Sequence, residues 1–344
     1  MTEHLIPSSA EAIELELAPE QLPADVDAAQ GLVVESLSPG RLALRRFRRN
    51  WSAMFGLVLL TLITLSAVFA SLISSHGQNE RLPAIAGKLS YAAPGAKAWL
   101  GTDDINRDLF TRILYGGRVS LFIGIAVALT SCFIGTLVGT LAGWRGGWID
   151  DVLMRITDVF LAFPILVSLL VIRNFFDKNN HDLPFWARWV SDLMGDKTSL
   201  RFMIILLSLI GWMGVARIVR GTVLSIKERE FIEAARALGA SGPRTVIRHV
   251  VPNSLGPIMV SMTVAVIGAI LAETTLSFFG YGASPGEGKA TWGGLISASQ
   301  GAVITGHWWV VVFPCAILVL TILSINFLGD GLRDAFDPKS ARIH

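Results

Sequence analysis

The chain has 344 residues, of which 52% are hydrophobic and 16% are charged, with a formal net charge of +2. A soluble globular chain carries about 25% charged residues. The excess of apolar residues, gathered into long runs, argues against a cytosolic enzyme and for a protein that lies in a lipid bilayer. The two cysteines, Cys132 and Cys315, both lie inside apolar runs. With no CxxC pair and no His/Cys cluster, we expect neither a disulfide framework nor a bound metal.

The N-terminal region changes charge abruptly. Residues 1–40 contain eight acidic residues and no Lys or Arg, which predicts an acidic, disordered cytoplasmic tail rather than a signal peptide. Residues 41–50 form a basic juxtamembrane segment directly before the first apolar run. Basic clusters beside a span mark the cytoplasmic side, so this segment predicts a cytoplasmic N-terminus. Its arginines are Arg41, Arg45, Arg46, Arg48 and Arg49.

Residues 51–344 are predicted to form an all-α, polytopic membrane domain. The first apolar run, of 23 residues, is about 35 Å long as a helix and exceeds the ~30 Å of the hydrocarbon core. In the second run, Gly135, Gly139 and Gly143 recur at every fourth position and predict a close helix contact. An even number of spans returns the C-terminus to the cytoplasm. The six expected spans are 51–73, 119–142, 153–173, 202–221, 257–279 and 309–329.

Long connections separate these spans. In one external connection Phe185, Trp186 and Trp189 recur at helical spacing, which predicts a short amphipathic helix at the outer interface. We expect Asp182 to cap this helix and Pro184 to lie in its first turn. The external segments are 74–118, 174–201 and 280–308, and the main cytoplasmic loop is 222–256.

The cytoplasmic loop has the pattern of two helices joined by a tight turn. Strong helix formers fill 222–238, and Gly239 is the expected left-handed stop. Ser241 is placed to cap a second helix with Pro243 in its first turn, and Pro252 is expected to end that helix. Its outer face of small residues and arginines suits a groove in another protein, although an ordinary intracellular loop is the alternative. Binding to DNA is disfavoured, because the loop is short and tethered at both ends.

One motif in the loop is specific. Reading along the chain it is Glu233-Ala234-Ala235, three residues, Gly239, nine residues and then His249-Val250-Val251-Pro252. This string resembles the EAA loop of ABC importer permeases. The family pattern ends in Ile-x-Leu-Pro, whereas this chain has His249 and Val251 at the Ile and Leu positions and resembles the variant frequent in peptide-importer permeases.

Four further segments match in order, at 99–121, 154–164, 272–282 and 327–338. They resemble the C-type subunit of the dipeptide and oligopeptide (peptide/nickel) transporter family, so the similarity covers roughly residues 41–340. The segment 99–121 is similar to the external GTDxxGRDxxSRxxYGxRxSL motif of that subunit. Asn106 stands where Gly is usual, and because Asn tolerates positive φ we expect the same turn.

The resemblance implies the type I ABC importer permease fold, with six transmembrane helices, and assigns roles to residues. The loop would be the contact that couples this chain to an ATPase subunit. The residues implied in that contact are Glu233, Ala234, Ala235, Arg236, Leu238, Gly239, Ala240, Ser241 and Arg244. The external motif residues are Gly101, Thr102, Asp103, Arg107 and Asp108.

The resemblance also implies a function and partners. The chain would be a non-catalytic subunit that forms half of a path for dipeptides or oligopeptides across a bacterial cytoplasmic (inner) membrane, with both termini cytoplasmic. Gly288-Lys289 lacks the rest of a GxxxxGK[ST] loop, so we expect no cofactor on this chain and assign ATP and Mg to two ATP-binding subunits. A second, B-type permease and an extracytoplasmic peptide-binding protein complete the expected assembly. Nickel chelates or another small solute are alternative cargoes, and an ion-coupled secondary transporter is the alternative class, for which no internal repeat is evident.

Polar residues inside the spans need partners or water, because a charge at the bilayer centre costs about 2.5–3.5 kcal/mol on insertion scales. Asp158 is expected to pair with Arg155 or to reach the interface. Glu273 either faces the translocation path or makes a buried hydrogen bond between spans. We hypothesise that Glu273 or Asn326 contributes to the path, and Asp158 is a further candidate.

Overall fold

The computed structural model describes residues 39–85, 87, 90–176, 184–196, 199–283 and 290–336. The expected acidic tail, apart from its last two positions, lies outside the described residues, as do Asp182 and Gly288-Lys289. The residues from Ala43 onward form one compact unit, and residues up to Leu42 belong to a separate one. Within the described ranges the chain forms helices, and no strand beyond isolated bridges in the external segments.

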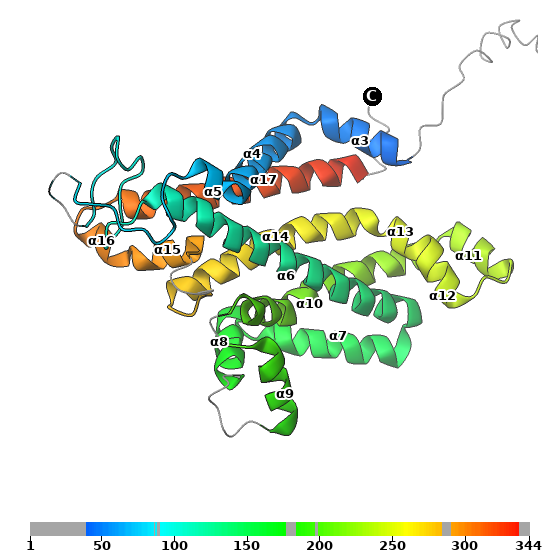
Figure 1. Cartoon of the computed structure of the whole chain (residues 1–344). Coiled ribbons are helices and arrows are strands. Elements are labelled where there is room, and N and C mark those ends of the chain that lie inside the picture. The colour runs from blue at the N-terminus through cyan, green and yellow to red at the C-terminus, as the bar shows by residue number, and fades with distance from the viewer. Residues whose placement is uncertain are drawn as a thin grey trace, which may run out of the picture. The chain divides into compact units, whose positions relative to one another are not determined.

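The helices are labelled in Figure 1. In the first half of the chain they are α3 (Pro39–Arg49), α4 (Trp51–Val68), α5 (Ala70–Ile73), α6 (Leu109–Arg145), α7 (Gly147–Ala162), α8 (Ile165–Phe175) and α9 (Phe185–Met194). In the second half they are α10 (Leu200–Lys227), α11 (Glu230–Ala237), α12 (Gly242–Thr245), a π-helical segment (Val246–Val250), α13 (Val251–Asn253), α14 (Leu255–Phe278), α15 (Trp292–Ala298), α16 (Gln300–Ile304) and α17 (Trp309–Phe336).

Five of these helices, α4, α6, α10, α14 and α17, are long and apolar enough to cross a membrane. The expected third span, 153–173, is wrong as a single straight helix. It is broken between α7 and α8, whose axes are bent by 97°, and only the bent pair counts as a sixth span. Pro164 explains the break, because proline has no N–H and disfavours a helical conformation of the preceding residue. Phe163 is indeed extended, at φ −85° and ψ 143°.

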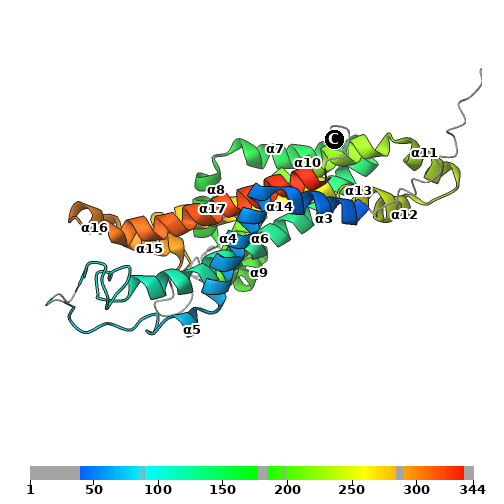
Figure 2. The same ribbon diagram turned by 90° about the horizontal axis from the view of Figure 1, so that it is seen from above.

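The long helices pack in a defined order. Helix α6 lies along α10, α4 lies along α17, and α14 contacts α6, α10 and α17 (Figures 1 and 2). One buried apolar cluster joins α6, α8, α10 and α14 and contains the fully buried Phe202 and Leu206. A second joins α4, α6, α14 and α17 around Trp292, which is 1% exposed. Both clusters include α6 and α14, so these two helices form the centre of the bundle.

The small face expected in the second span makes the contact between α6 and α10. A Cβ added at Gly135 would lie 2.7 Å from Val215 Cβ, and one added at Gly143 would lie 3.0 Å from Val223 Cβ. A Cβ added at Gly139 would collide with the backbone oxygen of Ala216. The glycines therefore allow the two backbones to approach closely over two turns, which confirms the predicted packing role.

The amphipathic helix expected in the second external segment is α9. Phe185, Trp189 and Leu193 share one face and are exposed, whereas Ala187 and Met194 are buried. Exposed aromatic side chains on one face suit the headgroup region of a bilayer. Pro184 lies at the N-cap position, one residue before the turn in which we expected it.

We predict that Gly139→Ala destabilises the bundle. Its methyl group would meet backbone that cannot move without separating α6 from α10, and overpacking of this kind costs about 1–3 kcal/mol. The melting temperature of the detergent-purified protein should fall by several degrees. Gly268→Ala is the matched control, because nothing lies within 4 Å of an added Cβ there. Equal melting temperatures for the two variants would contradict the packing role of Gly139.

Candidate functional site

The loop after α10 is folded differently from the single helix expected over 222–238. Helix α10 continues to Lys227, the chain breaks at Glu228, and α11 begins after Arg229, which is extended at φ −86° and ψ 143°. Ile226 and Ile232 explain the break. Both are buried in one cluster with Val219 and Val250. Six positions apart on a continuous helix, their side chains would point about 120° from each other, so the chain must turn to bury both.

The turn after α11 is as expected. Gly239 has φ +81°, in the left-handed region that favours glycine, and nothing lies within 4 Å of an added Cβ. The turn is closed by the amide of Ala240, which donates to Ala235 O at 3.0 Å. Ser241 occupies the N-cap position of α12, and Pro243 lies in the first turn. The Ser241 side chain makes no capping bond, however; its carbonyl accepts from the Thr245 amide at 2.9 Å.

Pro252 does not end the second helix, which corrects the expectation from the sequence. The chain stays helical through a π-helical segment and α13 up to Ser254. In the wider π-helix Val251 N donates to Val246 O, five residues back. The next residue, Pro252, has no N–H to donate. Side chains supply further donors: Asn253 Nδ2 bonds His249 O at 2.6 Å and Ser254 Oγ bonds Val250 O at 2.8 Å.

Trp144, at the end of α6, holds the loop in place, a role that sequence reasoning missed. Lys227 Nζ donates to Trp144 O at 2.9 Å, and the Arg236 guanidinium lies over the indole ring, 4.8 Å from its centroid. A Cβ added at Gly242 would lie 3.3 Å from the indole nitrogen. The end of α10, helix α11 and helix α12 therefore all meet one residue. The sequence offered one indication of this role: Trp144 directly precedes the Arg-Gly-Gly turn of residues 145–147.

The outward face of the loop contains most of the residues expected there. Leu238, at 89% exposed, and Ile247, at 72%, add two large apolar side chains to it, and Ile247 was not expected. Ala235 and Ala240 are half-buried. The expected residues that are exposed are Glu233, Ala234, Arg236, Leu238, Gly239, Ser241 and Arg244. Exposed apolar side chains among arginines on a well-anchored loop are typical of a surface that binds another protein.

The external motif is organised by Asp103, which is 6% exposed. One carboxylate oxygen accepts from Arg107 Nε at 2.7 Å and Arg112 Nη1 at 2.5 Å, and the other accepts from the Arg107 and Ile105 amides. Charge-assisted bonds of this kind stabilise a buried carboxylate. Tyr91 lies close by, and its burial, followed by the negative charges of Asp104 and Asp103, raises its pKa.

The other expected external residues tie this segment to the helices. Asp108 caps α6, its carboxylate accepting from the Thr111 amide at 2.8 Å. Thr102 Oγ1 accepts from the Ala92 amide at 2.8 Å, and Gly101 is close enough to Trp309 of α17 that an added Cβ would lie 2.7 Å from its indole nitrogen. Asn106 has φ +64°, as expected.

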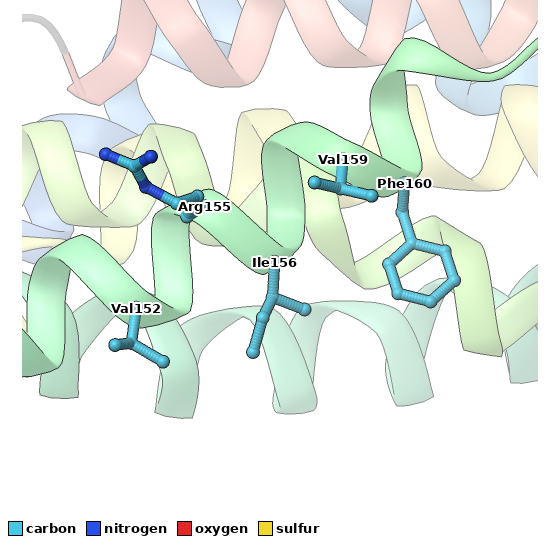
Figure 3. Close-up of a pocket in the computed structure, with 5 residues that line it drawn as sticks. All are labelled: Val152, Arg155, Ile156, Val159 and Phe160. Carbon is cyan, nitrogen blue, oxygen red and sulfur yellow. The ribbon is translucent and has the colours of Figure 1, made fainter.

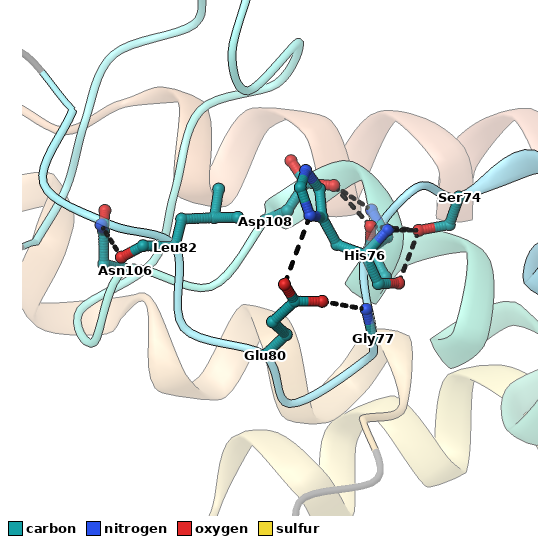
Figure 4. A network of polar contacts seen from close by, with 8 residues as sticks. Ser74, His76, Gly77, Glu80, Leu82, Asn106 and Asp108 are labelled. Atoms are coloured by element: carbon teal, nitrogen blue, oxygen red, sulfur yellow. Dashed lines mark hydrogen bonds and ion pairs between the residues drawn. The ribbon is translucent and has the colours of Figure 1, made fainter.

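Asn106 also does something that glycine cannot. Its side-chain amide donates to Leu82 O at 2.8 Å, the bond drawn in Figure 4, and to Pro83 O at 3.0 Å, so the turn is joined to the chain at residues 82 and 83. The same view shows, beside the Asp108 cap, Ser74 Oγ donating to His76 O at 2.9 Å and the Gly77 amide donating to the Glu80 carboxylate at 2.7 Å.

Two ion pairs join α7 to α10 inside the spans. Asp158 of α7 pairs with Arg217 of α10 rather than with Arg155, and both side chains are more than half exposed. Nearer the loop, Asp150 lies eight residues before Asp158 on α7 and holds Arg220, three residues after Arg217 on α10, with two bonds, of 2.5 and 2.6 Å. Arg155 lies on the outer face of α7 beside Val152, Ile156, Val159 and Phe160, which line a shallow hollow (Figure 3).

The two other path candidates differ in exposure. Glu273 is 0% exposed, and one of its oxygens accepts from Ser277 Oγ at 2.7 Å within the same helix. As described, Glu273 therefore presents no surface to a path. Asn326 of α17 is exposed.

Comparison with known proteins decides the family. The family described as "Binding-protein-dependent transport system inner membrane component" matches residues 135–342, more than half of the chain. The chain belongs to this permease family. A second match, to the "N-terminal TM domain of oligopeptide transport permease C", covers residues 38–94.

Individual members of the permease family are similar over most of their length. The dipeptide transport system permease protein DppC of Bacillus subtilis (strain 168) is 37% identical over 313 residues, covering 89% of this chain and 88% of that protein. The oligopeptide transport system permease protein OppC of the same organism is 36% identical over 320 residues, covering 93% and 96%. OppC of Escherichia coli (strain K12) is 36% identical over 313 residues, covering 90% and 95%.

Membership confirms the resemblance drawn from the motifs and the expected all-α permease fold. With five apolar helices and one bent pair, this permease is a multi-pass component of the inner membrane.

We predict that Asn106 is needed in this permease for its side chain as well as for its φ. Asn106→Gly keeps the turn but loses two hydrogen bonds, whereas Asn106→Val loses the bonds and strains a left-handed backbone. Melting temperatures of the purified variants should therefore fall in the order wild type, Asn106→Gly, Asn106→Val. A glycine variant as stable as the wild type would contradict the role of the side chain.

Proposed function

We propose that this chain is the permease subunit of an ATP-driven peptide importer and forms half of the translocation path. The relatives named as dipeptide and oligopeptide permeases support the cargo class. The observation that carries the mechanism is the anchored cytoplasmic loop with exposed Leu238 and Ile247. We infer that this loop docks on an ATP-binding subunit, which supplies the energy.

Coupling follows from how the loop is attached. A push on α11 is resisted by the Trp144 contact and by the buried Ile232, so the loop moves with α6 and α10 rather than alone. Because close-packed helices shift as rigid bodies, closure of an ATPase dimer would reorient the spans and alternate access to the path. We assign no catalytic step and no cofactor to this chain; ATP and Mg belong to the partners.

The assembly we propose contains two ATP-binding subunits, a second, B-type permease and an extracytoplasmic peptide-binding protein. One chain supplies one coupling loop, so two permeases are needed to engage two ATPase sites. We propose that the N- and C-termini lie in the cytoplasm, on the same side as the loop. Asp158, Glu273 and Asn326 are the candidates for the path; of these, Asp158 and Asn326 are the exposed ones.

The first test is contact. A cysteine at Leu238 should form a disulfide or a short bismaleimide crosslink with a single-cysteine scan of the ATP-binding subunit, in a Cys132→Ala/Cys315→Ala background. Trp189→Cys on the outer helix α9 is the matched control, since its exposed side chain lies far along the chain from the loop. A permease that never crosslinks through position 238 and never copurifies with an ATPase would contradict the proposal.

The second test is coupling at the turn. Gly239→Val should reduce peptide uptake in the assembled importer by about tenfold, because a β-branched residue at φ +81° strains the turn by roughly 1–2 kcal/mol or more. ATP hydrolysis should persist, so the variant should hydrolyse ATP without coupling it to transport. Gly239→Asn is the matched control: Asn tolerates the left-handed region and there is open space around the position. Equal uptake by the valine and asparagine variants would count against the turn as the coupling element.

A further inference from the structure

Three exposed charges lie deep within the candidate spans. Among the described residues of these helices, counting α7 and α8 as one span, Arg155, Asp158 and Arg217 are the exposed charged side chains more than two turns from a span end. Glu273, Arg112 and Arg173 are buried. Asp158 and Arg217 are ion-paired with their side chains 62% and 53% exposed. The three residues form what we name the α7–α10 charge cluster.

Lipid is a poor neighbour for this cluster. A charged side chain at mid-bilayer depth is expensive unless it meets water or protein. The Asp150–Arg220 pair between the same helices is sheltered, with side chains 11% and 33% exposed, so it can serve as a structural latch. The Asp158–Arg217 pair is left open on the surface of the chain.

Two glycines without side chains flank Arg217 on the exposed surface of α10. Gly214 and Gly221 are exposed one turn before and one turn after it, and nothing lies within 4 Å of a Cβ added at either position. Glycine inside a helix costs about 1 kcal/mol relative to alanine, so these positions lose stability while keeping the guanidinium unobstructed. An incoming charged group can therefore reach both members of the pair.

We propose that the α7–α10 charge cluster faces the aqueous translocation path and receives the charged ends of a passing peptide. This inference rests on the proposed function. A free peptide is a zwitterion: its carboxylate replaces Asp158 on Arg217, assisted by Arg155, while its ammonium replaces Arg217 on Asp158. Each exchange replaces one charge-assisted hydrogen bond with another of the same kind. The net binding energy is therefore small, and the peptide can both bind and leave.

The test uses the complete importer in proteoliposomes with its binding protein, and three forms of one peptide: free, N-acetylated and C-amidated. The variants are Arg217→Gln and Asp158→Asn. Asp151→Asn is the control, because Asp151 is an exposed carboxylate in the first two turns of α7 and lies outside the cluster. For each peptide the uptake of the variant is divided by that of the wild type. The same binding protein delivers the peptide to both, so its own selectivity cancels in this ratio.

We expect Arg217→Gln to lower uptake of the free and N-acetylated peptides by about tenfold, the size of one lost charge-assisted hydrogen bond, and to spare the C-amidated peptide. Asp158→Asn should lower uptake of the free and C-amidated peptides and spare the N-acetylated one. Asp151→Asn should change none of the ratios. Unchanged uptake, or an equal loss for all three peptides, would overturn the inference and leave the pair as a latch between helices.

Two further variants keep the test decisive. The exchanged pair Asp158→Arg/Arg217→Asp restores the ion pair if a single variant fails to assemble, and we expect it to lose discrimination between capped ends.

In a Cys132→Ala/Cys315→Ala background, Arg217→Cys should react with a charged, membrane-impermeant thiol reagent in at least one nucleotide state, and peptide should slow the reaction. No reaction in any state would mean that lipid or the second permease covers the cluster, and the inference would fail. Wild-type importer that moves no peptide would instead contradict the proposed function.

Discussion

The close contact between α6 and α10 is the constraint on which the rest of the structure depends. In a bilayer the lipid tails are as apolar as the helix surfaces, so the hydrophobic effect does not drive the helices together. Close packing must hold them instead. The glycine face of α6 provides it by bringing the α10 backbone within van der Waals distance over two turns. Helix α10 then continues without interruption to Lys227, where the loop begins, and α6 ends beside it at Trp144. The position of the cytoplasmic loop is thus set inside the membrane.

The second constraint is that polar groups must be satisfied within the chain wherever water is scarce. Arg118 of α6 shows this at the C-terminal end of α4. Its guanidinium donates to Ala67 O at 2.6 Å and to Val68 O at 2.7 Å, carbonyls that the end of the helix leaves free. Asp103 does the same work in the external segment by accepting from two arginines and two amides. Such bonds join the N-terminal part of α6 to its surroundings.

What the sequence could reveal depends on the range of the interaction. Gly239 and Asn106 were predictable, because a left-handed backbone selects residues locally. The contact face of Gly135, Gly139 and Gly143 was predictable from its spacing alone. The helix irregularities at Pro164 and near Pro252 were harder to predict: a proline signals that a hydrogen bond is missing, but whether the chain bends by 97° or widens into a π-helix depends on what packs around it.

Partners distant in the chain were out of reach. Arg155 is three positions from Asp158, which made it the obvious candidate, yet Arg217 from another helix is the partner. Trp144 was missed for the same reason, since its contacts with Lys227 and Arg236 join residues more than 80 positions apart. Local patterns identify turns and faces; a single sequence carries no record of which faces meet.

These attachments divide the helices into parts that move together and a part that is free to move separately. The loop is fixed to both α6 and α10, which are fixed to each other, so we expect them to act as one rigid body. Helix α7 is joined to that body in a different way. Gly146 and Gly147, with φ of +66° and +56°, connect it to α6, and two ion pairs bind it to α10. Ion pairs tolerate changes in distance and angle that interlocked glycine faces do not, so a displacement of the loop would be relieved first between α7 and α10, where the exposed charges lie.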